Sequence, residues 1–114
     1  MGGEISLFVN IFFKCQDQWR QTIIKSLLDL GAIQMFINKH WVETQGLILH
    51  ELPHPIAVNN TDSTSSHGHI THYVTFIIQY QGHSEGVDAL VATLETHDLI
   101  LGFDWLFCHN PEID

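Results

Sequence analysis

The amino-acid sequence predicts an all-β fold, a small barrel or sandwich of short strands. Short apolar runs recur along the chain, and several of them alternate apolar and polar residues as half-buried strands do. Turn residues, glycine above all, separate these runs. No repeat and no linker divides the 114 residues, so one domain spanning 1–114 is expected. Many short strands joined by tight turns are typical of closed or sandwiched β-sheets.

In the first half of the chain, two strands are expected at 5–13 and 22–28, joined by a polar turn. The segment 36–43 fits either a short strand or a helical turn, and its pattern does not decide between them. A short apolar run, Ile56-Ala57-Val58, is expected as a further strand. It leads into 59–68, whose Asn, Ser, Thr and Gly content predicts a loop.

In the second half, the strand expected at 70–79 has the clearest alternation of the chain. Gln81-Gly82 follows it as a hairpin turn, and 87–93 is expected as the returning strand. The next apolar run, Leu99-Ile100-Leu101, ends at Gly102. A short helix is expected at 104–109, near the C-terminus.

The charge balance excludes two classes of partner. Four Lys and Arg against thirteen Asp and Glu give a net charge of −9, which repels both nucleic acid and anionic membrane surfaces. The sequence shows neither a membrane-spanning segment nor a signal peptide, so an intracellular, cytoplasmic protein is expected. Cys15 and Cys108 are then expected to be reduced thiols.

One carboxylate stands in a distinctive place, in Leu27-Leu28-Asp29-Leu30-Gly31-Ala32, between an apolar strand and a glycine turn. A strand-end Asp commonly caps a turn through its side chain. The alternative is catalytic: two such carboxylates brought together by a two-fold axis can act as acid and base on one peptide bond. The second apolar run, which ends at Gly102, gains meaning only in combination with this motif.

In order and spacing, these motifs resemble the retropepsins, the homodimeric aspartic proteases of retroviruses and LTR retrotransposons, and among them the Ty3/gypsy type. The family's active-site strand, apolar-apolar-Asp-Ser/Thr-Gly-Ala, is similar to Leu27–Ala32, and its Phe-Ile-Asp element to Phe36-Ile37-Asn38. The approach to the flap, its return strand, the second glycine element and the chain ending resemble 55–62, 68–74, 98–106 and 109–114. The resemblance covers residues 5–114.

This resemblance implies a retropepsin-like closed β-barrel, the acid-protease fold, with one short C-terminal helix and assembly as a two-fold homodimer. Asp29 of each subunit would form the catalytic dyad, without metal or cofactor. The active-site turn would be Leu30, Gly31 and Ala32, and the second glycine element Ile100, Leu101 and Gly102. The flap would span about 59–70, with Asp62, Ser63, Thr64 and Gly68. The implied activity is that of an aspartic endopeptidase of a retrotransposon polyprotein, cutting extended polypeptides with apolar residues at the cleavage site.

Leu30 departs from this family pattern, because it replaces the Ser or Thr whose hydroxyl braces the two active-site loops across the dimer axis. Asn38 replaces an Asp of the Ty3/gypsy pattern. An alternative function is therefore a catalytically silent retropepsin-like domain used for dimerisation or peptide binding. A third reading concerns the cluster His67, His69 and His72, whose first two side chains would share a face of a strand and could bind zinc. Solvent-facing polar positions are the simpler interpretation of this cluster, and no metal is expected.

Overall fold

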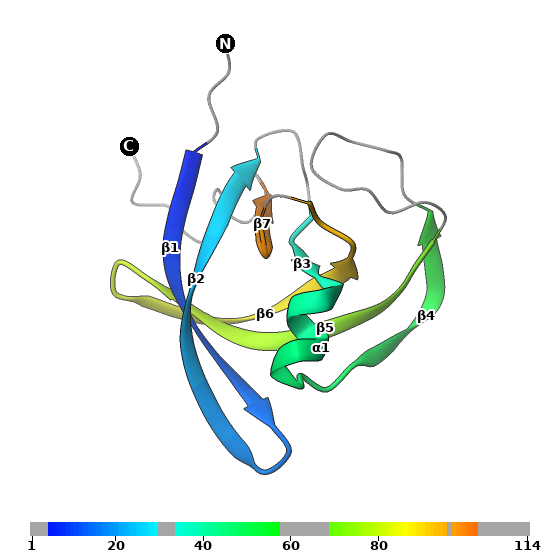
Figure 1. Ribbon diagram of the computed structural model, residues 1–114, viewed down its shortest axis with the longest axis horizontal. Coiled ribbons are helices and arrows are strands. Elements are labelled where there is room, and N and C mark those ends of the chain that lie inside the picture. The colour runs from blue at the N-terminus through cyan, green and yellow to red at the C-terminus, as the bar shows by residue number, and fades with distance from the viewer. Residues whose placement is uncertain (1–4, 30–33, 58–68, 96, 103–114) are drawn as a thin grey trace.

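Seven β-strands and one helix form the part of the chain that the structure describes, residues 5–29, 34–57, 69–95 and 97–102 of a computed structural model (Figure 1). In chain order they are β1 (Ile5–Cys15), β2 (Gln18–Asp29), β3 (Phe36–Asn38), α1 (Lys39–Gln45), β4 (His50–Ala57), β5 (His69–Tyr80), β6 (His83–Ala92) and β7 (Leu99–Gly102).

The strands form one sheet in the order β1-β2-β7-β3-β6-β5-β4. Strand β1 also pairs with β5, which closes six of the strands into a barrel and leaves β4 attached to the outer side of β5. The predicted all-β closed barrel is confirmed. The helix of the described residues is α1, whereas the helix expected at 104–109 lies outside them.

The hairpin predicted at Gln81-Gly82 is confirmed. Both residues have positive φ, 50° and 83°, as the tight turn matching the twist of the flanking strands requires. Strand β6 starts directly after this turn, at His83, which pairs with Tyr80. The pairing therefore begins four residues before the expected start at 87, because backbone hydrogen bonds extend the strand through polar residues whose alternation is weak.

The segment 36–43, which was expected as either a strand or a helical turn, contains both. It begins as strand β3 and continues as helix α1. The strand ends and the helix begins at Asn38, which is the N-cap of α1. Its backbone is extended (φ −70°, ψ 126°), and its side chain accepts a hydrogen bond from the His40 N–H. Gly46 ends the helix in the left-handed conformation, donating its N–H to the Val42 carbonyl. No helix among the described residues is long and apolar enough to cross a membrane.

Strand β4 is longer than expected, since it begins at His50 instead of Ile56, while Val58 lies outside the described residues. Among the described residues it is an edge strand that pairs with β5 alone, and its register shifts between Glu51 and Ile56. Pro53 and Pro55 fall within this irregular stretch. Proline interrupts the apolar pattern used to recognise strands, yet an edge strand tolerates it because one side of its backbone needs no partner.

Two apolar clusters fill the two sides of the sheet. The barrel interior contains alternate residues of its strands, among them Val9, Ile11, Ile37, Leu99 and Leu101. The second cluster consists of Leu27, Ile70, Leu90, Ala92, Leu94 and Ile100. Because successive residues of β7 point to opposite faces and both faces are covered, all four of its residues are buried.

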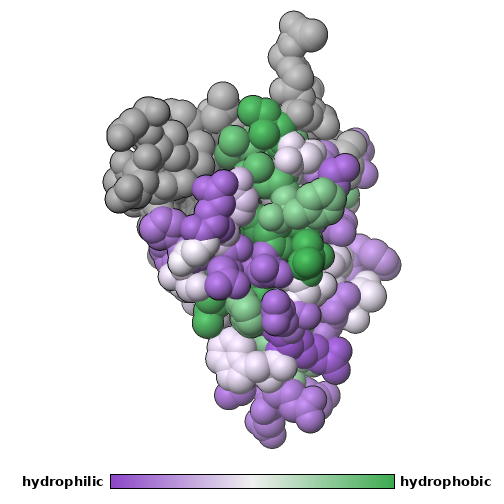
Figure 2. Space-filling model, turned by 90° about the vertical axis from the view of Figure 1, so that its left-hand side faces the viewer, coloured by the Kyte–Doolittle hydropathy of each residue, from purple (hydrophilic) through white to green (hydrophobic). Residues whose placement is uncertain are grey.

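Four large apolar side chains remain exposed on β1 and β2: Ile5, Phe8, Trp19 and Ile23, at 50, 68, 61 and 66% of their full accessible surface. Figure 2 shows an apolar band between polar residues on the side of the molecule where β1 lies. Exposed apolar groups gathered in this way mark a surface that can contact another protein.

Candidate active site

The two glycine-ending elements lie side by side, although they are far apart in the sequence (Figure 1). Strand β7 runs parallel to β2, with Leu27 opposite Ile100, Leu28 opposite Leu101, and Asp29 opposite Gly102. Asp29 is therefore the last residue of β2 and lies at the same end of the sheet as Gly102. The remaining predicted residues of the active-site turn and flap lie outside the described residues: Leu30, Gly31, Ala32, Asp62, Ser63, Thr64 and Gly68.

Strand β7 is held on both sides, by β2 and by β3, which pairs antiparallel to it through Phe36 opposite Ile100 and Ile37 opposite Leu99. Ile100, Leu101 and Gly102 are all buried. Leu101 points into the barrel interior, whereas Ile100 belongs to the second cluster on the opposite face. Within the predicted glycine element, Leu101 thus packs inside the barrel and Ile100 packs in the second cluster.

The second cluster lies next to the end of β2. Leu27 and Ile100 are opposite each other, Phe36 is opposite Ile100, and Leu90 of β6 is opposite Phe36. Two side chains of the β4–β5 pair, Leu52 and Tyr73, pack against the same cluster. Leu27, Leu90 and Ile100 are buried in this cluster, whereas Phe36, Leu52 and Tyr73 are only partly buried. The site predictions did not include Phe36 and Leu90, because only the parallel pairing of β3 with β6 brings them together.

Hydrogen bonds between Asn38 and Asp98, which we call the polar bracket, join the start of α1 to the start of β7. The Asn38 backbone N–H donates to the Asp98 carbonyl at 2.9 Å, and its side-chain Nδ2 donates to Asp98 Oδ1 at 3.2 Å. The Asn38 Oδ1 accepts hydrogen bonds from the backbone N–H groups of His40 and Leu94, both at 3.4 Å. Asp98 directly precedes β7, so the bracket helps to set the position of the strand that lies beside Asp29.

The bracket also explains why an amide stands at position 38. Asn38 donates to a carboxylate with one end of its side chain and accepts two N–H groups with the other. An ionised Asp at this position could accept but not donate. Asp98 was not among the predicted site residues. Its position just before the apolar run that ends at Gly102 is the feature of the sequence that could have indicated it.

One buried polar atom on β2 has no partner among the described residues, the Oγ of Ser26. Ser26 is fully buried, opposite Leu7 of β1 and Leu99 of β7. A buried hydroxyl without a hydrogen bond destabilises the folded state. It lies on the strand that ends at Asp29.

The histidine cluster is divided, because His67 lies outside the described residues while His69 and His72 are part of β5. Thr71 Oγ1 and His72 Nδ1 are hydrogen-bonded at 2.8 Å. Among the described residues, no group of three or more His, Cys, Asp or Glu side chains could hold a metal ion.

The comparisons with known proteins agree on the fold. The retroviral protease-like domain of Ddi1 from Leishmania major has a TM-score of 0.59 and 21% identity, over 91% of this chain and 77% of that chain. EIAV protease, in complex with the inhibitor HBY-793, has a TM-score of 0.57 and 19% identity, over 93% and 88% of the two chains. A retropepsin-like aspartic protease from Rickettsia conorii has a TM-score of 0.55 and 15% identity, over 92% and 79%.

The TM-scores of these three structures show a shared retropepsin-like fold. The sequence itself matches the family model of the PEG10/RTL1 protease domain over residues 25–114, which includes the last part of β2 up to Asp29, the bracket and β7. The chain therefore belongs to the PEG10/RTL1 protease domain family and is a retropepsin-like protease domain.

Proposed function

We propose that this chain supplies half of an aspartic endopeptidase, in which Asp29 from each of two copies forms the catalytic dyad. The observation that carries the proposal is the parallel register of β2 and β7, which ends with Asp29 opposite Gly102 in a retropepsin-like barrel. A second copy is required because one carboxylate cannot act as base and acid in the same step.

The chemistry follows from holding two carboxylates close together. Like charges at about 3 Å cannot both ionise, so the pair shares one proton. The ionised carboxylate takes a proton from a water molecule, whose oxygen attacks the peptide carbonyl carbon. The protonated carboxyl group gives its proton to the carbonyl oxygen, which forms a diol at the former carbonyl carbon. The first carboxylate, now protonated, then gives its proton to the leaving nitrogen as the C–N bond breaks, and one diol hydroxyl returns a proton to the pair.

An exposed apolar residue supports assembly across this end of the sheet. Ile5 pairs with Leu28, the neighbour of Asp29, and keeps half of its surface exposed. A two-fold axis near Asp29 would bring Ile5 close to the partner subunit, where its burial would stabilise the dimer.

The substrate we propose is an extended polypeptide with apolar residues at the cleavage site, such as the polyprotein of a Ty3/gypsy-type element inside the cell. The partly buried Phe36, in the apolar cluster beside the end of β2, supports this class of substrate. The antiparallel β4–β5 pair, which flanks the proposed flap segment, contributes Leu52 and Tyr73 to the same cluster.

The test is cleavage of a mixed peptide library, followed by mass spectrometry at several pH values from about 4 to 7, because a carboxylate pair keeps its shared proton only below its upper pKa. We expect cleavage next to apolar residues that is abolished in Asp29→Asn. The matched control is Asp17→Asn, the same change at an exposed turn at the opposite end of β2, which should keep full activity.

The alternative, a silent domain used for dimerisation or peptide binding, is favoured by Leu30 in place of Ser or Thr. A protein that forms dimers in sedimentation experiments but cleaves no peptide at high concentration would contradict the protease proposal and support this alternative. A protein that remains monomeric at every concentration would contradict both the dyad and the dimer.

A further inference from the structure

The hairpin of β1 and β2 leaves most of one edge of β2 without a partner strand. Strand β1 pairs with β2 along its whole length, and Figure 1 shows the turn between them extending away from the rest of the molecule. On its other side, β2 pairs with β7 over residues 26–29. Among the described residues, 18–25 therefore have no partner strand on the side away from β1, and we call this stretch the open edge. Such an edge can pair with another extended chain.

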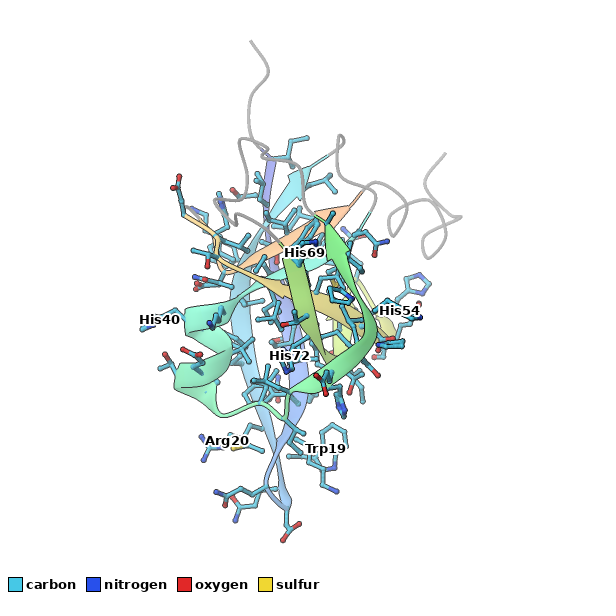
Figure 3. The ribbon with its side chains drawn as sticks, turned by 90° about the vertical axis from the view of Figure 1, so that its right-hand side faces the viewer. Trp19, Arg20, His40, His54, His69 and His72 are labelled. Atoms are coloured by element: carbon cyan, nitrogen blue, oxygen red, sulfur yellow. The ribbon has the colours of Figure 1, made fainter. Side chains whose placement is uncertain are left out.

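The open edge carries large apolar side chains on one face. Ile24 is buried in the barrel interior, so the residues on either side of it point outward, as alternation along a strand requires. Trp19 and Ile23 belong to this outer face and keep 61 and 66% of their accessible surface exposed. Figure 3 shows Trp19 and Arg20 on opposite sides of the hairpin, near its turn. A chain that paired with the open edge would cover Trp19 and Ile23.

Opposite charges stand at the two ends of the open edge. Asp17 directly precedes it in the turn, and Lys25 is its last residue. Both side chains are exposed, and both are on the outer face, since they differ from Trp19 and Ile23 by two positions. An antiparallel copy of the same strand would bring Asp17 of each chain near Lys25 of the other. Opposite charges placed across a strand pair stabilise it.

We infer that the open edge binds the open edge of a second copy of this chain, as two antiparallel strands related by a two-fold axis at Gln21. In this register, Trp19 lies opposite Ile23 of the second copy, and Asp17 lies opposite its Lys25. The symmetry repeats each of these contacts. Directly opposite residues of an antiparallel pair point to the same face, so both apolar pairs form on the outer face and bury surface that is exposed in the single chain.

The structure of β2 selects this register. An axis at Thr22 would place Gln18 opposite Ser26 of the second copy, where β7 already occupies the edge. An axis at Arg20 would place this residue opposite itself, and like charges directly opposite destabilise a strand pair. An axis between two residues would set inward-facing side chains opposite outward-facing ones. The axis at Gln21 uses the whole open edge and avoids all three conflicts.

This contact is separate from the proposed dyad. The open edge begins next to the turn, whereas Asp29 is the last residue of β2. One copy can therefore contact one partner near each end of β2, and two different two-fold contacts join copies into tetramers or longer chains. The pairing of open edges requires neither cleavage nor the dyad.

The first experiment exchanges the charges at the ends of the open edge and measures association of the full chain by sedimentation equilibrium. About 0.15 M salt limits repulsion between the acidic chains, because it screens exposed charges more than about 8 Å apart. Asp17→Lys and Lys25→Asp each set like charges opposite each other at two places, so each should weaken association about tenfold. These variants shift the net charge in opposite directions, so a general charge effect cannot weaken both.

Two combinations should restore association to within about threefold of the original. One is a single chain that carries both Asp17→Lys and Lys25→Asp, and the other is an equal mixture of the two single variants. Each combination sets opposite charges together again at both places. Recovery in the mixture also shows that the single variants are folded. Failure of both combinations to recover would overturn the inference.

The second experiment locates the contact by cross-linking. Gln21→Cys places a thiol of each copy at the axis, where a short bis-maleimide should link two chains at least about fivefold faster than in Ser84→Cys. Ser84 is exposed on β6, outside the open edge, and the unsubstituted chain, with Cys15 and Cys108, gives the baseline.

Equal rates of linking at positions 21 and 84 would overturn the inference. A chain that cleaves peptides through Asp29 but does not link at position 21 would overturn it as well, while leaving the proposed function intact. Linking at position 21 in a chain that cleaves nothing would support the pairing of open edges and contradict only the protease.

Discussion

Asn38→Asp is the sharpest test of how the candidate site is held together, because it replaces only the side-chain NH2 group of Asn38 in the polar bracket with an oxygen. The variant keeps an oxygen that can accept from the N–H groups of His40 and Leu94. It loses the Nδ2–H that donates to Asp98 Oδ1 and places a second carboxylate at about the same 3.2 Å separation. Two effects therefore act in the same direction.

The magnitude follows from these two effects. Losing a hydrogen bond to a charged group costs about 1.5–3 kcal/mol. Two like charges at about 4 Å repel by about 1 kcal/mol in water and about 4 kcal/mol in a partly buried setting. A negative charge at the start of α1 interacts favourably with the helix dipole, which stabilises the folded variant by about 0.3–1 kcal/mol. We expect Asn38→Asp to lower the free energy of unfolding at neutral pH by about 2–4 kcal/mol.

The variant should also acquire a new dependence on pH. When the pH falls, the two carboxylates can share a proton, so the folded variant binds more protons than its unfolded chain. Stability then rises as the pH falls toward about 4.5, and declines as the pH rises. Asn10→Asp is the matched control, because Asn10 lies on β1 and its side-chain oxygen only accepts, from Gln21 Nε2 at 3.5 Å.

Urea unfolding followed by tryptophan fluorescence, at about pH 7 and 4.5, measures both effects, since the half-buried Trp41 packs against Phe13. Combining Asn38→Asp with Asp98→Asn exchanges donor and acceptor and should restore most of the lost stability. If Asn38→Asp were as stable as the original chain at neutral pH, or the combined exchange restored nothing, the bracket would not hold β7 as described.

Three further changes have definite expectations. Ser26→Ala removes a buried hydroxyl without a described partner and should raise the free energy of unfolding by up to about 1 kcal/mol, while a clear loss would reveal a partner. Gly82→Ala places a side chain at φ 83° and should lower the free energy of unfolding by about 1 kcal/mol. An unchanged thermal unfolding midpoint would contradict the argument that a side chain is strained in this turn. Leu30→Thr supplies the hydroxyl of the family pattern and should tighten the dimer about tenfold or more, at 1.4 kcal/mol per tenfold, and raise cleavage. An unchanged dimer constant in sedimentation would refute that role for position 30.

Several features could be predicted because their signals are local. Gln81-Gly82 encodes its turn through the backbone conformations that the two residues tolerate. Alternation in β5 shows which of its side chains face inward, and Val74, Phe76 and Ile78 are indeed buried. The segment 36–43 stayed ambiguous because α1 buries only Val42 fully, too few residues to show a helical period.

By itself, the sequence determined the all-β class, the hairpin of β5 and β6, and the two glycine-ending elements that indicated the family. The tertiary structure decided that these elements are parallel neighbours, that Asn38 is joined to Asp98, and that the open edge of β2 has no partner strand among the described residues. The physical reason is the distance along the chain over which each interaction acts. Turns and alternation depend on neighbours along the chain, whereas strand order and hydrogen bonds between distant residues depend on how the whole sheet closes and packs.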